Sequence, residues 1–274
     1  MAICAAGALP ALAGDRTVVA RRDAFGGACP RCELSGRKLA GAHFMGANFA
    51  GAALVGSDLR RARFMGSVFV GADLSKADLS DAQFLGANFT NAKMANAKLR
   101  SAEAHGVSFA SADLSGADMR GMEALGADFS RAAMTGADLR GAELVGSQMR
   151  QADARGADFT GTDVRHAVLS SGRFDKVSFR GAELDGAVLT GSTFAAADFR
   201  GANLDRAILA GADLSRARGL EQDQLDAACA DGRTRVPRGL TPRICASRLL
   251  VRTPPPLPPA PPVPPAPRFL AATP

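Results

Sequence analysis

The sequence predicts an all-β fold in which the chain winds into a four-sided solenoid, closed near its C-terminal end by a short helix. Three observations support this prediction. A large apolar residue recurs at every fifth position from Leu34 to Leu214 with no insertion or slip. A small residue, most often alanine, stands two positions earlier, and Asp, Asn or Glu commonly stands between the two. Neither the 3.6-residue period of a helix nor the two-residue period of a strand generates this pattern.

The residues of this five-residue series, which we call centre positions, are uniformly apolar. Stepping by five from Leu34 to Leu214 gives 37 centre positions, occupied by 16 Leu, 13 Phe, four Met, three Ala and one Val. Such a step requires a chain that turns a corner every five residues and buries one large and one small side chain on each side. Four sides close one coil, and stacked coils then pair through backbone hydrogen bonds at a spacing of about 4.8 Å.

The repeated motif is Ala-(Asp/Asn)-(Leu/Phe)-x-x, as in Ala72-Asp73-Leu74 and Ala87-Asn88-Phe89. This motif resembles the signature of the pentapeptide-repeat proteins, and the resemblance covers residues 32–216. It implies a right-handed quadrilateral β-solenoid, the pentapeptide-repeat β-helix. In that fold the centre residue and the preceding alanine point inward, and the other three residues point outward. About nine coils at roughly 4.8 Å each predict a rod on the order of 40 Å long.

The ends of the rod are predicted from the flanking residues. Residues 14–31 form a lead-in, and residues 217–245 form a closing segment, because an uncapped end coil exposes its core and its unpaired strand edge. Gly219 to Cys229 has the pattern of a short helix, with Leu220 and Leu225 as apolar contacts. The residues from Asp231 to Leu240 resemble the closing segment of many members of the family.

Residues 1–13 predict an export signal. The apolar run Ala2–Ala13 ends in Ala11-Leu12-Ala13 before the polar Gly14, which is the pattern of a cleaved secretory signal. The run is too short to cross a bilayer as a helix, so we expect no transmembrane segment. Basic residues before the run are missing; either the true start lies upstream or the run is not an export signal. We expect a periplasmic or secreted protein, with a cytoplasmic location as the alternative.

Cysteine spacing favours two structural disulfides. Removal of residues 1–13 leaves Cys29, Cys32, Cys229 and Cys245, two pairs that are local in sequence and suit an oxidising compartment. Cys29-Pro-Arg-Cys32 also fits a redox motif, but the thioredoxin-like setting of such motifs is missing around it. A zinc site shared by both pairs would require the two ends of the rod to meet. No cofactor or metal is therefore expected.

Residues 246–274, the proline-rich tail, have no capacity to pack a core. Residues 253–268 read TPPPLPPAPPVPPAPR, which predicts a polyproline II conformation. The PxxP spacing fits ligands of aromatic-lined grooves, but a stiff spacer or disordered tail is the favoured interpretation.

One side of the predicted rod carries a column of arginines. Residues 32–216 contain 21 Lys/Arg and 21 Asp/Glu, so the repeat region has no net charge. Because residues 20 apart stack, the positions after the centres Leu39, Leu59 and so on form a column that we call the arginine column: Arg60, Arg100, Arg120, Arg140, Arg180 and Arg200. Aspartates such as Asp58 precede the same centres. The favoured interpretation is a self-neutralised surface, since exposed ion pairs contribute little; polyanion binding is the alternative.

The next side carries an apolar column. After the centres Phe44, Phe64 and Phe84 and their successors come the residues that we call the apolar stripe: Met45, Met65, Leu85, Leu125 and Val145, interrupted by His105. Glu103, Glu123 and Glu143 flank its second half. A contiguous exposed apolar strip is a candidate interface. The alternative is that neighbouring glycines let these side chains lie flat against the coil.

The sequence predicts a protein that is not an enzyme. His43, His105 and His166 fall at different positions of their repeats and about three coils apart, so no two can share a site. Neither a catalytic triad, nor a paired-carboxylate cleft, nor a phosphate-binding glycine loop is apparent, and we expect no small-molecule substrate. The glycines mostly take the last position of a repeat, where we expect a corner that demands a small residue.

The functional prediction is an exported interaction module that presents flat faces to a protein partner or to a second copy, as in a homodimer. The family resemblance implies a second hypothesis, because some pentapeptide-repeat proteins mimic duplex DNA and bind type II topoisomerases. That role requires a strongly acidic rod in the cytoplasm, which the neutral repeat region does not match. Nucleic-acid binding through the arginine column is disfavoured as well, because outward-facing aromatics for base stacking are missing.

Overall fold

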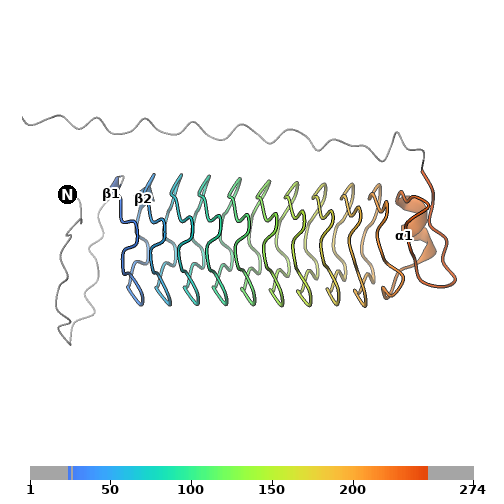
Figure 1. Ribbon diagram of the computed structural model, residues 1–274, viewed down its shortest axis with the longest axis horizontal. Coiled ribbons are helices and arrows are strands. Elements are labelled where there is room, and N and C mark those ends of the chain that lie inside the picture. The colour runs from blue at the N-terminus through green and yellow to red at the C-terminus, as the bar shows by residue number, and fades with distance from the viewer. Residues whose placement is uncertain (1–23, 26, 246–274) are drawn as a thin grey trace, which may run out of the picture.

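The protein forms a straight rod of stacked coils (Figure 1). The computed structural model describes residues 24–25 and 27–245. The strands β1 (Ala24–Phe25) and β2 (Phe44–Met45) lie at the N-terminal end of the rod, and the helix α1 (Gln222–Ala227) lies at the other end. The chain advances by one coil at a time, as the colour gradient in Figure 1 shows. The predicted segments 1–13 and 246–274 lie outside the described residues.

Each coil contains 20 residues. Parallel backbone pairs join residues 20 apart without interruption from Ala28↔Asn48 to Asp198↔Arg218. Strands β1 and β2 pair in the same register, Ala24 with Phe44 and Phe25 with Met45, so the pairing reaches back before residue 32. Each side holds only a few extended residues before the next corner, and for this reason a β-solenoid contains so few residues in continuous strands. Its right-handed sense stays a prediction from the resemblance.

The corners are β-turns with a left-handed residue. At a typical corner the Ala42 amide donates to the Leu39 carbonyl at 3.0 Å. The second residue after each centre from Leu34 to Leu209 has φ between 52° and 70°, as at Gly41 and Arg61. A positive φ at this place is the feature of a type II turn, which favours glycine. The expectation that the corner demands a small residue is wrong. The backbone conformation is what selects glycine, and Arg61 or Lys76 is accommodated because its side chain points outward.

The core is a continuous column of centre side chains. Every centre from Phe49 to Leu214 is at most 4% exposed, and so are the alanines that precede them by two residues through Ala212. Phenylalanines on one side stack in register through the coils, with ring centroids 4.6 to 5.3 Å apart from Phe49 through Phe129. These separations are close to the coil spacing, so a ring in each coil contacts the rings above and below.

Unusual residues in the core compensate one another in volume. Ala124 is a small centre, and the residue two before it is the large Met122; both are fully buried. Phe174 follows Gly172, where an added Cβ would lie 2.5 Å from the Phe174 ring. Interiors are packed closely enough that one methyl group matters. At these two places the departure from Ala-x-Leu/Phe is a paired exchange of volume between adjacent inward positions.

Buried serines in the core give a matched test of hydrogen bonding. Ser192 Oγ donates to the Leu169 carbonyl and accepts from the Gly172 amide, whereas Ser147 Oγ has no partner. Both residues are at most 1% exposed. We expect Ser192→Ala to lower the free energy of unfolding by about 1–3 kcal/mol, because it leaves buried groups unpaired. We expect Ser147→Ala to be neutral or stabilising. Urea denaturation of both variants checks this, and equal losses would contradict it.

The C-terminal helix contacts the last coils. It begins later and ends earlier than the predicted 219–229, at Gln222 and Ala227. Gln224 Nε2 donates to the Phe199 and Ala202 carbonyls at 3.0 and 2.7 Å, and Leu225 is buried. The Arg206 amide donates to the Ala227 carbonyl. Gln224 thus adds a side-chain donor to two carbonyls at the end of the rod. The helix's role as a cap stays a prediction.

Candidate interaction surface

The apolar stripe lies at the corner that follows each centre from Phe44 to Leu144. Met45, Met65, Leu85 and Leu125 are 46%, 40%, 48% and 41% exposed, and Val145 is half-buried. Each stripe residue is followed by a glycine with positive φ, such as Gly66 or Gly126. The glycine carries no side chain that could cover its neighbour. The large side chains therefore project outward along one column, which His105 interrupts between Leu85 and Leu125.

Register extends the column by one coil at its start. Phe25 pairs with Met45, so the backbone of Phe25 lies one coil before Met45 in the column that contains the stripe. At the other end the stripe stops at Val145. The same column then continues as Arg165, Asp185 and Asp205, with ion pairs from Arg165 to Asp163 and from Arg206 to Asp185. This column is thus apolar along its N-terminal part and charged along its C-terminal part. The change to charged residues was not predicted, although the same 20-residue step shows it.

His105 is the polar residue that interrupts the stripe between Leu85 and Leu125. Its Nε2 lies 3.8 Å from the Glu123 carboxylate, and its buried Nδ1 has no hydrogen-bond partner. Gln83 Nε2 donates to Glu103 at 3.1 Å. Carboxylates therefore line one edge of the stripe, as the positions of Glu103, Glu123 and Glu143 predict.

The arginine column is paired with aspartates along most of its length. Arg60 donates from Nε and an Nη to both oxygens of Asp58 at 2.8 and 2.7 Å, and Arg140 does the same to Asp138. Asp118 accepts from both Arg100 and Arg120. Arg200 pairs with Asp198. In the repeat of Arg180 the aspartate is replaced by Ser178. At Arg60, Arg120 and Arg140 this bidentate pairing engages two of the guanidinium donors and neutralises the charge locally.

The ion pairs perturb the carboxyl groups. Hydrogen bonds from Arg120, and then from Arg100, hold the pKa of Asp118 at about 2, although partial burial acts in the opposite direction. The hydrogen bond from Arg200 holds the pKa of Asp198 at about 2, and Arg140 lowers the pKa of Asp138. These carboxylates stay ionised throughout the neutral range.

These pKa values predict a loss of stability in acid. A carboxyl in the unfolded chain has a pKa near 3.9, so its paired form stabilises the fold above about pH 4 and loses that contribution as pH falls toward 2. We expect the free energy of unfolding to be flat from pH 8 to 5 and to decline between pH 4 and 2. Asp118→Asn should flatten that decline, as measured by urea denaturation across the range. A decline of equal slope in the variant would contradict the assignment.

Both predicted cysteine pairs lie at bonding distance. Cys29 and Cys32 have Cα atoms 5.3 Å apart, and Cys229 and Cys245 have Cα atoms 5.4 Å apart. Cys29 takes a centre position and Cys32 an inward position of the next side, so the bridge spans one corner. The two pairs lie at opposite ends of the rod. Among residues 24–25 and 27–245 no three His, Cys, Asp or Glu side chains form a group that could hold a metal.

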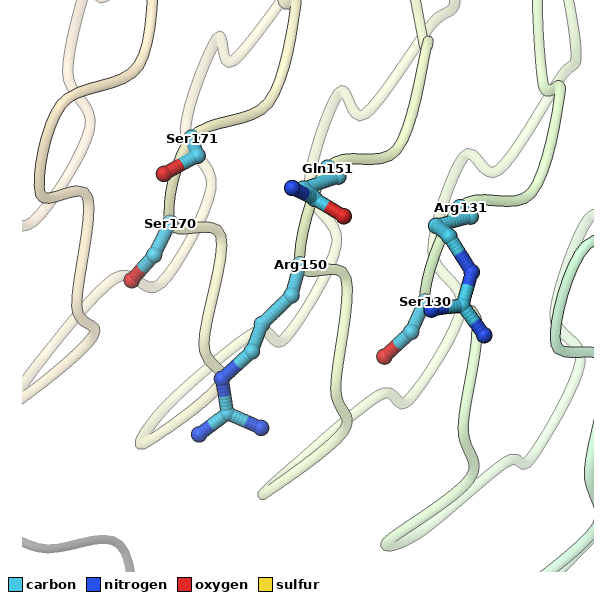
Figure 2. A pocket seen from close by; sticks show the side chains of 6 residues that line it. All are labelled: Ser130, Arg131, Arg150, Gln151, Ser170 and Ser171. Carbon is cyan, nitrogen blue, oxygen red and sulfur yellow. The ribbon is translucent and has the colours of Figure 1, made fainter.

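A shallow polar depression of about 350 Å³ lies on the side after the stripe. It is lined from three successive coils by Ser130, Arg131, Arg150, Gln151, Ser170 and Ser171 (Figure 2). Arg150 extends outward and donates to Gln148, while Arg131 donates to Ser111. The hydroxyls that line it have no imidazole or carboxylate among the lining residues to act as a base. The depression therefore lacks the nucleophile–base pair of covalent catalysis.

Within the described part of the chain, no helix is long and apolar enough to span a bilayer.

Comparisons with known proteins converge on one family. The family described as pentapeptide repeats matches in eight copies, over residues 31–170 and 182–218. The crystal structure of HetL, a pentapeptide repeat protein involved in heterocyst differentiation regulation from the cyanobacterium Nostoc sp. strain PCC 7120, is 28% identical with a TM-score of 0.58. That match covers 73% of this chain and 89% of HetL.

Two further structures are similar over less of the fold. A pentapeptide repeat protein from the Arabidopsis thaliana thylakoid lumen is 33% identical over 42% of this chain and 72% of its own, with a TM-score of 0.30. QnrB1, a plasmid-mediated fluoroquinolone resistance protein, is 26% identical over 66% of this chain and 90% of its own, also with a TM-score of 0.30. The comparison with curated protein sequences found no match.

Proposed function

Because the chain belongs to the pentapeptide repeat family, we propose that it is a non-enzymatic interaction module whose protein partner binds the apolar stripe. The observation that carries the proposal is the row of side chains exposed by 40% or more at Met45, Met65, Leu85 and Leu125. Soluble proteins rarely leave such a contiguous strip uncovered unless it contacts something. The glycines beside the stripe leave it accessible, and the flat outer surface of the coils suits an extended contact.

The proposal includes export to the periplasm or beyond the cell. The support is the two cysteine pairs, since disulfides persist in oxidising compartments. HetL, a related protein of known structure, is described as taking part in regulation, which is compatible with action through binding.

Two other functions have less support. A DNA mimic requires a strongly acidic rod, and residues 32–216 have 21 positive and 21 negative side chains. A polyanion-binding column requires free guanidinium donors, and the arginines at 60, 120, 140 and 200 are paired with aspartates.

The proposal is tested by charging the stripe. We expect Leu85→Asp/Leu125→Asp to reduce by at least tenfold the amount of partner that co-purifies from the native cells. The matched control is Val55→Asp, because Val55 is 38% exposed but stands alone on the opposite side of the rod. Both variants should keep the parent's unfolding midpoint. Retention of the partner by the stripe variant, or equal loss in the control, would contradict the proposal.

A further inference from the structure

We propose that the partner of the apolar stripe is a second copy of this chain, which lies antiparallel along the same stripe of the first copy. This inference rests on the proposed function, because it names the protein that occupies the same surface. Three features support it: the positions of the apolar residues, the distribution of charge beside them, and the glycines that accompany the stripe along its whole length.

Two copies can meet in register along the stripe. The rod is straight (Figure 1), and the column from Met45 to Val145 passes through six consecutive coils, about 24 Å at roughly 4.8 Å per coil. A two-fold axis between the coils of Leu85 and His105 places each half of one stripe on the opposite half of the other. Such an interface is closed and uses the same surface on both copies. The facing residues are Met45 with Val145, Met65 with Leu125, and Leu85 with His105.

The charges beside the stripe are segregated along the rod. The residues directly before the centres of this side form a second column, which we call the flanking column: His43, Arg63, Gln83, Glu103, Glu123 and Glu143. Its first half contains an arginine and no carboxylate, and its second half contains three exposed glutamates. Arg61, at the preceding corner, adds a positive charge to the coil of Arg63. Neither arginine forms an ion pair with another residue among 24–25 and 27–245.

The antiparallel arrangement brings the opposite charges together. The same two-fold axis sets Arg63 of each copy opposite Glu123 of the other, and Gln83 opposite Glu103. Each dimer therefore contains the contact between Arg63 and Glu123 twice, and no carboxylate of the flanking column faces another carboxylate. Complementary charges of this kind determine the register and the orientation of two surfaces. The surface beside the stripe is thus complementary to itself.

Other arrangements of two copies fit this surface less well. If the two rods were parallel, the stripe side of one copy would face the side after the stripe of the other, and Glu123 would meet Asp128. Like charges that face each other in this way disfavour an interface. In the antiparallel arrangement, a shift by one coil either removes Val145 from the contact between the stripes or sets Glu103 against Glu103. The register with the axis between Leu85 and His105 avoids both.

Glycines keep the corner beside the stripe low along the whole contact. The residue after each position of the column is glycine in six successive coils, from Gly46 to Gly146, and His166 takes this place in the next coil. The positive φ favours glycine but does not require it, since Lys76 adopts the same conformation at another corner. An added Cβ at Gly126 or Gly146 would meet no atom within 4 Å, so the rod has room for a side chain there. A closely approaching second rod accounts for the run of glycines.

The contact ends where the column becomes charged. Arg165, Asp185 and Asp205 follow Val145 in the same column and face no stripe residue in this arrangement. Arg165 already pairs with Asp163 within the rod. The apolar residues of the column are thus confined to the six coils that two antiparallel copies share.

Charge reversal tests the proposal by sedimentation equilibrium of the full-length protein. We expect the parent to dimerise as its concentration rises. Arg63→Glu and Glu123→Arg, each alone, should raise the dissociation constant of the dimer by about tenfold or more, because like charges then face each other at both contacts. The double variant Arg63→Glu/Glu123→Arg should return to within about threefold of the parent, since it restores opposite charges at each contact.

The matched control is Lys76→Glu. It reverses one exposed charge at the corner diagonally opposite the stripe and should leave the dissociation constant unchanged. A parent that stays monomeric up to about 1 mM would overturn the proposal. A double variant that dimerises as weakly as the single variants, or an equal weakening in Lys76→Glu, would overturn it as well.

A cysteine pair tests the antiparallel register. Met65→Cys/Leu125→Cys should form a disulfide-linked dimer on mild oxidation, because the two-fold axis sets each of these positions opposite the other in the second copy. Within one chain they lie three coils apart, about 14 Å, which is too far for a disulfide. Met65→Cys alone is the control and should give no linked dimer. A linked dimer from Met65→Cys alone, as parallel rods would give, or none from the double variant, would overturn the proposal.

Neither readout depends on another protein, so failure of this inference is distinguishable from failure of the proposed function. If the parent is monomeric and Leu85→Asp/Leu125→Asp still loses a co-purifying protein of another sequence, the second copy is excluded as the partner and the proposed function stands.

Discussion

Phe109→Ala is expected to lower the free energy of unfolding by about 3–5 kcal/mol, because it removes a fully buried ring and leaves a cavity. Phe109 stacks between Phe89 and Phe129 with centroid distances of 5.3 and 5.0 Å. Each coil contacts only its neighbours, so the loss weakens the middle of the rod at one interface. Urea denaturation followed by circular dichroism measures the change.

Two variants bracket this prediction. Phe109→Leu retains most of the volume and should cost less, about 1 kcal/mol. Leu85→Ala removes an exposed side chain and should change stability by less than about 0.5 kcal/mol. Three centres are naturally alanine. At Ala124 the large Met122, two residues earlier, fills the space that a larger centre would occupy. In Phe109→Ala the residue two before the centre is the smaller Val107, which would not fill that space. A loss below about 1 kcal/mol in Phe109→Ala would contradict the packing described for the core.

Loss of the Cys229–Cys245 disulfide is the second large effect. The bridge closes a loop with a sequence separation of 16, for which chain entropy predicts about 3 kcal/mol of stabilisation. Cys229→Ser/Cys245→Ser should therefore release the closing segment. Hydrogen exchange should accelerate at the amides of Arg206 and Leu209, which donate to Ala227 and Cys229.

The other bridge is the matched control for this effect. Cys29 and Cys32 are separated by only three positions, and the same model assigns such a short loop about 2 kcal/mol at the opposite end of the rod. Cys29→Ser/Cys32→Ser should leave exchange at Arg206 and Leu209 unchanged. Faster exchange there in both double variants, or in neither, would show that the C-terminal bridge does not hold the closing segment.

The register of the fold was predictable because the repeat has no insertion. The five-residue step from Leu34 to Leu214 determines which residues stack, and the pairs at 20-residue separation follow from it. Pairing before residue 32 was not predicted, because Ala24 and Cys29 occupy centre positions without being Leu or Phe. The positive φ at the corners was also not predicted. Glycine at every corner would have indicated it, but several corners carry residues such as Lys76 and Arg131.

The positions of the candidate surface residues were predictable from the sequence, but their exposure and their side-chain contacts were not. The positions of Met45, Met65 and Leu85 follow from the 20-residue step, whereas their exposure depends on how each side chain lies at its corner. The pairing of Arg100 with Asp118, one coil away, depends on side-chain conformations that no spacing determines. His105 is similar, because its position in the repeat does not predict that its Nδ1 is buried without a hydrogen-bond partner.

The most direct measurement places a photo-crosslinking residue at Leu125 and, in a separate variant, at Asp205 of the same column, in the native cells. If the partner binds the apolar part of this column, Leu125 yields one discrete adduct with a second polypeptide, and Asp205, on the charged part, does not. Identical adducts at both positions, or no adduct with another polypeptide at Leu125, would contradict the assignment of the stripe as the interaction surface.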